Sequence, residues 1–106
     1  MTGRPTVGIN TNMRAELLLR QRQIIGEDRF VDATIWRLHR SLPGSRHAFK
    51  YRLALIVDGI CVLRYDNEAG KGDHKHIGEA QAPYFFTTLD RLVEDFWRDV
   101  ENWRSE

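Results

Sequence analysis

Residues 48–65, AFKYRLALIVDGICVLRY, decide the fold that the sequence predicts. If the first half of this stretch is an extended strand, every second side chain lies on the same face, and the residues on that face are Phe49, Tyr51, Leu53, Leu55 and Val57. Alternation of this kind is typical of a strand with one buried face. Asp58-Gly59 then supplies a two-residue turn, because both central positions of a type I′ turn need positive φ. The stretch therefore predicts a β-hairpin with strands at 48–57 and 60–65.

A second hairpin is predicted upstream of the first. Residues 14–25 are rich in Leu and Ile, residues 26–29 are glycine or charged, and residues 30–39 are rich in β-branched and aromatic side chains. Two such runs across a short polar break favour a hairpin, although helix propensity leaves a helix open for the first run. Residues 1–13 have no sustained apolar pattern, so we expect a flexible N-terminal arm or a short edge strand there.

The chain downstream adds one short strand and one helix. His74–Gly78 is predicted to be a fifth strand. Leu89–Trp103 is predicted to be an amphipathic helix, because its apolar residues recur with a period near 3.6, and Thr87 or Thr88 is the expected N-cap. The predicted fold is α+β: an antiparallel β-meander of four to five strands with a C-terminal amphipathic helix packed on the sheet, in a single domain over residues 14–106.

The composition is that of a globular domain. The chain has 106 residues, of which 42% are hydrophobic and 29% are charged; this length suffices for one domain with a modest core. No apolar run approaches the roughly 18 to 20 residues of a membrane span, and the first residues lack the hydrophobic region of a signal peptide. We therefore expect a cytoplasmic protein without a membrane partner. Cys61 lies in an apolar run and is expected to pack in the core.

Charge is distributed unevenly along the chain. Residues 1–64 contain 11 Lys/Arg against 5 Asp/Glu, a net charge of +6, and residues 65–106 contain 5 against 10, a net charge of −5. The two halves account for the overall charge of +1. A basic half suits a polyanion and an acidic half suits a basic protein surface. Neutralisation of one half by the other across the fold is the alternative.

Groups that can move a proton or hold a phosphate concentrate in residues 64–79, RYDNEAGKGDHKHIGE. His74 and His76 are spaced i, i+2, which places them on one face of a strand about 6.5 to 7 Å apart. Two imidazoles at this spacing can take and give a proton across a phosphate. Gly70 and Gly72 would let backbone amides approach that phosphate. The candidate cations are Arg64, Lys71 and Lys75, and the candidate carboxylates that orient a histidine are Asp66 and Asp73.

The same residues leave two other interpretations open. The His-x-His pair together with Asp66 offers three N/O ligands for a metal ion, but no fourth ligand is evident. Alternatively, the stretch is a solvated loop in which Asp66 and Asn67 cap a turn. His39 and His47 flank a basic loop and are expected at the surface.

One long string of residues resembles the hallmark of the TumE family, small proteins known as toxins of bacterial and archaeal toxin–antitoxin modules: RYDNE at 64–68 followed by GKGDHKHI at 70–77. The leading hairpin, the Asp58-Gly59 turn and the helix with Phe96-Trp97 also fit, so the resemblance covers most of the chain from about Arg14. It implies a DNA-binding antitoxin of the winged-helix type that neutralises the toxin by direct contact. It supports a site that includes Tyr65, Asp66, Lys71, Asp73, His74 and His76, and it assigns no reaction.

The leading hypothesis is a toxin of a type II module that acts as a metal-independent endoribonuclease and needs no cofactor. Its predicted catalytic residues are His74, His76, Asp66 and Lys71. Its predicted substrate-binding residues are Arg64, Tyr65, Asp73, Lys75, Arg52, Lys50 and Arg46. The basic segment that begins at Arg40 would hold the RNA backbone in a salt-dependent manner.

Two other functions fit the sequence. One is a non-catalytic interaction protein whose loop docks on the DNA-binding antitoxin, and the other is a metal-dependent nuclease or phosphotransferase. The sequence is compatible with a homodimer and with a toxin–antitoxin hetero-oligomer.

Overall fold

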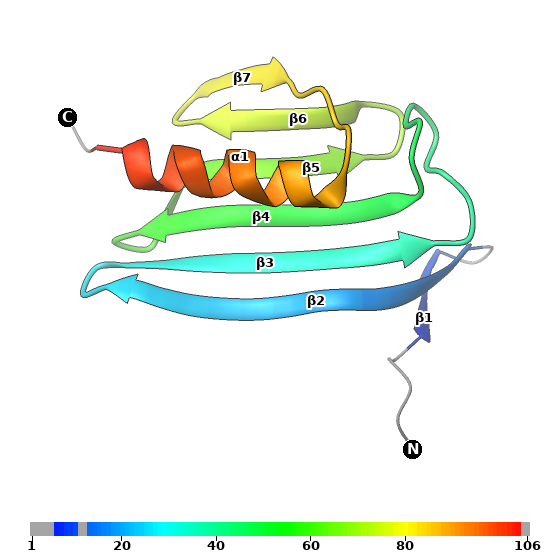
Figure 1. Cartoon of the computed structure of the whole chain (residues 1–106), viewed down its shortest axis with the longest axis horizontal. Coiled ribbons are helices and arrows are strands. Elements are labelled where there is room, and N and C mark those ends of the chain that lie inside the picture. Colours follow the sequence, from blue (N-terminus) through cyan, green and yellow to red (C-terminus); the bar gives the residue numbers. More distant parts are fainter. Residues whose placement is uncertain (1–5, 11–12, 105–106) are drawn as a thin grey trace.

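In the part of the chain that the structure describes, the protein forms an antiparallel sheet with a helix on one of its faces (Figure 1). The structure, a computed structural model, describes residues 6–10 and 13–104. Within these described residues the sheet has seven strands in the order β1 to β7, so each strand pairs with its neighbours in the sequence. The elements are β1 Thr6–Asn10, β2 Met13–Gly26, β3 Arg29–Leu38, β4 Phe49–Val57, β5 Ile60–Glu68, β6 Gly72–Ile77, β7 Ala80–Pro83 and α1 Leu89–Asn102.

The predicted α+β meander is confirmed, but the sheet has more strands than the four to five expected. Strand β1 lies within residues 1–13, the segment predicted as an arm or a short edge strand, and it pairs with the start of β2. Residues 1–5 and 11–12 of that segment lie outside the described residues. Strand β7 pairs with β6 although all four of its residues are exposed. An edge strand that buries no side chain has no apolar alternation from which it could be predicted.

Both predicted hairpins form. Strand β2 is extended over 14 residues, which decides against the helical alternative for this run. At the β4–β5 turn, Asp58 and Gly59 have φ of 51° and 79°, the positive values that a type I′ turn requires. Alternation in β4 is also confirmed, since the residues buried on one face are Tyr51, Leu53, Leu55 and Val57.

Strand β5 continues three residues beyond its predicted end because Asn67 completes the pairing with β4. The Asn67 side chain is fully buried. Its Oδ1 accepts a hydrogen bond from the Tyr51 amide at 3.0 Å, and its Nδ2 donates to the Phe49 carbonyl at 2.7 Å. The side-chain amide thus satisfies two backbone groups that would otherwise be buried without partners. The alternative in which Asp66 and Asn67 cap a solvated turn is wrong, since both residues belong to the strand.

Helix α1 covers the apolar face of the central strands. Thr88 is the N-cap, and its side chain accepts a hydrogen bond from the Arg91 amide at 3.1 Å. The helix buries Leu92, Phe96 and Val100 in the main core, which also contains the apolar side chains of β3, β4 and β5. A smaller cluster consists of Ala15, Leu38 and Leu42, with Trp36 packed against it. No helix among the described residues is long and apolar enough to span a membrane.

Cys61 is exposed, so the prediction that it packs in the core is wrong. It lies just after the Asp58-Gly59 turn, where the β4–β5 register shifts. Leu55 pairs with Leu63, and the next residue, Ile56, pairs with Cys61. Val62 therefore has no partner on β4 and is the extra residue of a bulge. A bulge interrupts the in–out alternation of a strand, and for that reason the apolar run did not predict the side that Cys61 faces.

Candidate functional site

Strands β5 and β6 divide the predicted site residues between the two faces of the sheet. Opposite residues of antiparallel strands share a face, and consecutive residues alternate. Arg64 pairs with His76 and Asp66 with His74, whereas Tyr65 pairs with Lys75. The Tyr65 ring lies 5.7 Å from that of Phe96 in α1. Tyr65 and Lys75 therefore face the helix, and the two histidines lie on the opposite face, called here the open face.

The open face brings four of the predicted residues together. The ring centroids of His74 and His76 are 6.4 Å apart. The Asp66 carboxylate lies between the Arg64 guanidinium and the His76 imidazole: Arg64 Nε is 3.0 Å from Oδ2, and His76 Nε2 is 3.7 Å from Oδ1. His74 Nε2 is buried and has no hydrogen-bond partner among the described residues. We call these residues, together with their neighbour Arg52 on β4, the histidine cluster.

The environment of His76 lowers the pKa of its imidazole below the ordinary value of 6.5. Burial contributes most, followed by the positive charge of Arg64, while Asp66 acts in the opposite direction. Because the pKa falls, the neutral imidazole predominates at pH 7. A neutral imidazole can accept a proton, so His76 has the protonation state of a general base.

The opposing effects of Arg64 and Asp66 give a prediction for the pKa of His76. Arg64→Gln removes a positive charge and is expected to raise this pKa, whereas Asp66→Asn removes a negative charge and is expected to lower it. NMR titration of the His76 ring signals would measure both shifts. Arg91→Gln, on the helix, is the control and should leave the pKa unchanged. Shifts of the same sign in the two variants would contradict the arrangement of charges described above.

A row of polar residues continues from the histidine cluster across the open face. Arg52 pairs with Asp66, Thr34 pairs with Arg52, and Arg20 on β2 pairs with Thr34. Within residues 6–10 and 13–104, neither Arg20 nor Arg52 has an ionic partner. A neighbouring arginine, Arg22, forms an ion pair with Asp32 at 3.0 Å. These side chains surround a hollow of about 350 Å³.

Sequence reasoning missed Arg20 and Arg22 because they are far from residues 64–79 in the chain. Their i, i+2 spacing is the same signal that placed His74 and His76 on one face. The sequence does not give the register in which the strands of the sheet pair, and this register places the arginines of β2 on the same face as the histidines of β6. Register depends on turn geometry and on the packing of the whole sheet.

Three predicted site residues lie on the helix face instead. Lys75 Nζ is 3.0 Å from Asp99 of α1, and the Tyr65 hydroxyl donates a hydrogen bond to the same carboxylate. Asp73 accepts a hydrogen bond from the Tyr51 hydroxyl at 2.6 Å. Burial and the adjacent carboxylates raise the pKa of both tyrosines far above the usual range, so both remain donors. Tyr65 and Lys75 therefore join the helix to the sheet, whereas Asp73 binds Tyr51 of β4.

His47 is a central part of this network, and the expectation that it lies at the surface is wrong. Its side chain is only 12% exposed, and its ring lies 3.8 Å from that of Phe86. Nδ1 accepts a hydrogen bond from the Phe49 amide at 3.1 Å, which leaves Nε2 to donate to Asp73 at 2.8 Å. Both ring nitrogens are thus engaged within the protein.

The glycine-containing turn between β5 and β6 contacts the basic loop rather than leaving its amides open. The Gly70 amide donates to the Pro43 carbonyl at 2.6 Å. A side chain at Gly44, whose φ is 84°, would approach the Gly70 backbone to 3.2 Å. Lys71 is exposed and lies 3.6 Å from Glu68. The turn therefore anchors the loop, and the Gly70 amide is not free to bind a phosphate.

The two remaining predicted residues lie near this anchored loop. Arg46 is exposed within it. Lys50, at the start of β4, donates a hydrogen bond to the Asn67 carbonyl at 2.9 Å. Lys50 lies two residues before Arg52 in the strand, so alternation places both on the open face. Among the described residues, no group of three His, Cys, Asp or Glu side chains is arranged to hold a metal ion.

Comparison with known proteins gives one match. A family model described as Toxin TumE matches residues 9–104 of the chain, which agrees with the resemblance found in residues 64–77. Neither the curated proteins nor the solved structures contain a match.

Proposed function

Since this chain belongs to the TumE family of toxins, we propose that it is the toxin of a two-protein module and that it acts by cleaving RNA without a metal ion. The proposal includes a DNA-binding, winged-helix-type antitoxin as the partner. The observation that supports the cleavage is the histidine cluster: two imidazoles with centroids 6.4 Å apart on a face that also presents arginines. Such a pair can serve a phosphate placed between its members.

The proposed reaction uses the ribose 2′-hydroxyl as the nucleophile. Neutral His76 takes the 2′-hydroxyl proton, and the 2′-oxygen forms a bond to the adjacent phosphorus. The bond from phosphorus to the 5′-oxygen breaks, and His74 gives a proton to that leaving oxygen through Nδ1, because its Nε2 is buried. The products are a 2′,3′-cyclic phosphate and a free 5′-hydroxyl, and the two histidines have exchanged protonation states.

Asp66 and the arginines have supporting roles in this reaction. Asp66 lies 3.7 Å from His76, so it stabilises the imidazolium that forms when His76 takes the proton. Arg64 and Arg52 flank the pair on β5 and β4, and their charges would stabilise the negative charge that develops on the phosphate oxygens. Arg20 and Lys50 extend the cationic surface along which the RNA backbone would lie. Binding through such contacts weakens steeply as salt concentration rises.

Inducible expression in a bacterium, with growth and total RNA followed together, tests the proposal. The parent protein is expected to arrest growth and to cleave RNA, and His74→Ala/His76→Ala is expected to do neither. His39→Ala is the matched control, because His39 is exposed in the loop after β3, and it should behave like the parent. Cleavage by the purified parent should also persist in the presence of a chelator.

The other outcomes contradict defined parts of the proposal. Growth arrest with intact RNA would leave a toxin and reject the ribonuclease. Cleavage that a chelator abolishes would favour a metal-dependent nuclease. An absence of arrest, together with intact RNA, would favour a non-catalytic protein that binds its antitoxin.

A further inference from the structure

Among the described residues, no strand lies beside the outer edge of β2 over most of its length. Strand β1 pairs with β2 only over Met13–Glu16. From Leu17 to Gly26, nothing in the part of the chain that the structure describes pairs with this edge. Every residue from Gln21 to Gly26 is exposed, and Ile24 is 77% exposed. An edge of this length presents a row of backbone N–H and C=O groups that can accept another strand.

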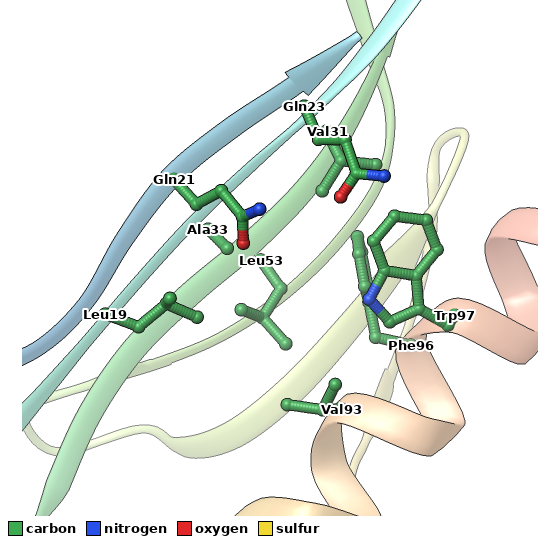
Figure 2. Close-up of a pocket in the computed structure, with 9 residues that line it drawn as sticks. All are labelled: Leu19, Gln21, Gln23, Val31, Ala33, Leu53, Val93, Phe96 and Trp97. Atoms are coloured by element: carbon green, nitrogen blue, oxygen red, sulfur yellow. The ribbon is translucent and has the colours of Figure 1, made fainter. Parts of the chain in front are cut away.

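On the helix side, an apolar groove runs beside this edge (Figure 2). It lies between β2 and α1 because the helix packs over the central strands and leaves the outer strands uncovered (Figure 1). Its volume is about 80 Å³, several times the space that one water molecule needs. The lining residues are Leu19, Gln21, Gln23, Val31, Ala33, Leu53, Val93, Phe96 and Trp97. Room therefore exists for an apolar side chain that reaches over β2.

The same strand presents positive charge on the open face. Arg20 and Arg22 pair with Thr34 and Asp32 of β3. Asp32 neutralises Arg22, whereas Arg20 has no ionic partner within the described ranges. A strand added at this edge would thus meet an apolar groove on one side and positive charge on the other.

We propose that the outer edge of β2, from Leu17 to Ile25, binds an extended segment of a partner protein as an additional strand. Side chains of an extended segment alternate between two faces, so the segment that fits has apolar residues at one parity and Asp or Glu at the other. Main-chain hydrogen bonds would supply affinity, and the alternating side chains would supply specificity.

The charge on this edge favours an acidic partner. Arg20 has no ionic partner among the described residues, so a carboxylate opposite it would form an ion pair. A second copy paired antiparallel about Gln21 would instead place Arg22 opposite Arg20. Asp32 already neutralises Arg22, so that pairing would supply no carboxylate to Arg20. That the segment belongs to an antitoxin rests on the proposed function, but the binding surface itself does not.

The probe is a synthetic peptide of about nine residues in which Glu alternates with Leu or Val, and hydrogen exchange of the full chain is followed by NMR. Binding is expected to slow exchange of the outward-facing amides between Leu17 and Ile25 and to shift the Trp97 indole signal. Arg20→Glu/Arg22→Glu is expected to weaken binding about tenfold. The charge-matched control is Arg40→Glu/Arg104→Glu, which changes two exposed arginines outside β2 and should bind as the parent does.

Four results would overturn the proposal. The first is that the peptide does not bind at millimolar concentration, and the second is that the Trp97 signal shifts while hydrogen exchange of the β2 amides stays unchanged. The third is that a peptide with Lys in place of Glu binds equally well. The fourth is that exchange of the β2 amides in the protein without peptide slows as the protein concentration rises. The last result would assign the edge to a second copy. An unchanged amide spectrum for β4 to β6 shows that each variant is folded. RNA cleavage is measured separately, so failure of the ribonuclease and failure of the docking surface can be told apart.

Discussion

Replacing His76 with glutamine is expected to lower the rate of RNA cleavage by about 10²- to 10⁴-fold, the usual contribution of a general acid or base. His74→Gln should have an effect of similar size, because the two residues act on opposite sides of the same phosphate. The two effects should not multiply in the double variant, since either substitution alone removes the proton relay. Glutamine keeps the polarity and approximate size of the ring, so the sheet should remain folded.

The pH dependence of the cleavage rate tests the proposed role of His76 as the general base. In the proposed mechanism the parent's rate rises with pH through the pKa of His76, which lies below 6.5, because only the neutral imidazole accepts a proton. This rising limb should be absent from His76→Gln. Cleavage of a short RNA by purified protein between about pH 4.5 and 8 would measure it, with His39→Gln as the control. Parent-like rates in both single variants would remove the histidines from the mechanism.

The second large effect is expected from Phe96→Ala, which should destabilise the fold by about 3–5 kcal/mol. Phe96 is 1% exposed and contacts the edge of the Tyr65 ring at a centroid distance of 5.7 Å. Its removal leaves a cavity between α1 and the sheet. Domains of this size are stable by roughly 5–15 kcal/mol, so the loss is a large share of the total.

Urea unfolding followed by circular dichroism would measure the change in the free energy of unfolding. Phe96→Leu keeps most of the buried volume and should cost clearly less. Glu94→Ala on the exposed side of the helix is the surface control and should change stability by no more than about 0.5 kcal/mol. A loss below about 1 kcal/mol for Phe96→Ala would mean that the helix contributes little to the core.

The fold was predictable where local rules are strong. Alternation in β4, the Asp58-Gly59 turn and the apolar stripe of α1 each follow from the geometry of one element. Strand β7 and the last residues of β5 were not predictable, because their pairing depends on neighbouring strands. Asn67 illustrates this: a polar residue in a loop-like context belongs to the strand because β4 offers its backbone groups.

The site was predictable in part for the same reason. The i, i+2 spacing places His74 and His76 together, and the same alternation separates Lys75 from them. The sequence does not reveal which of the two faces the helix covers. The roles of Tyr65 and Asp73 follow only from their contacts with α1 and with the loop before β4, and both contacts are long-range in the chain.

The position of α1 in the chain has a consequence for synthesis on the ribosome. Strands β1 to β7 precede the helix, and each pairs with its neighbour in sequence, so hairpins can form one after another as the chain emerges. The helix alone supplies Leu92, Phe96 and Val100 to the core. A nascent chain therefore exposes the apolar face of its sheet until residues 89–102 have left the exit tunnel. During this interval the domain would be vulnerable to aggregation and to proteases, and it would become fully ordered only after translation of the helix.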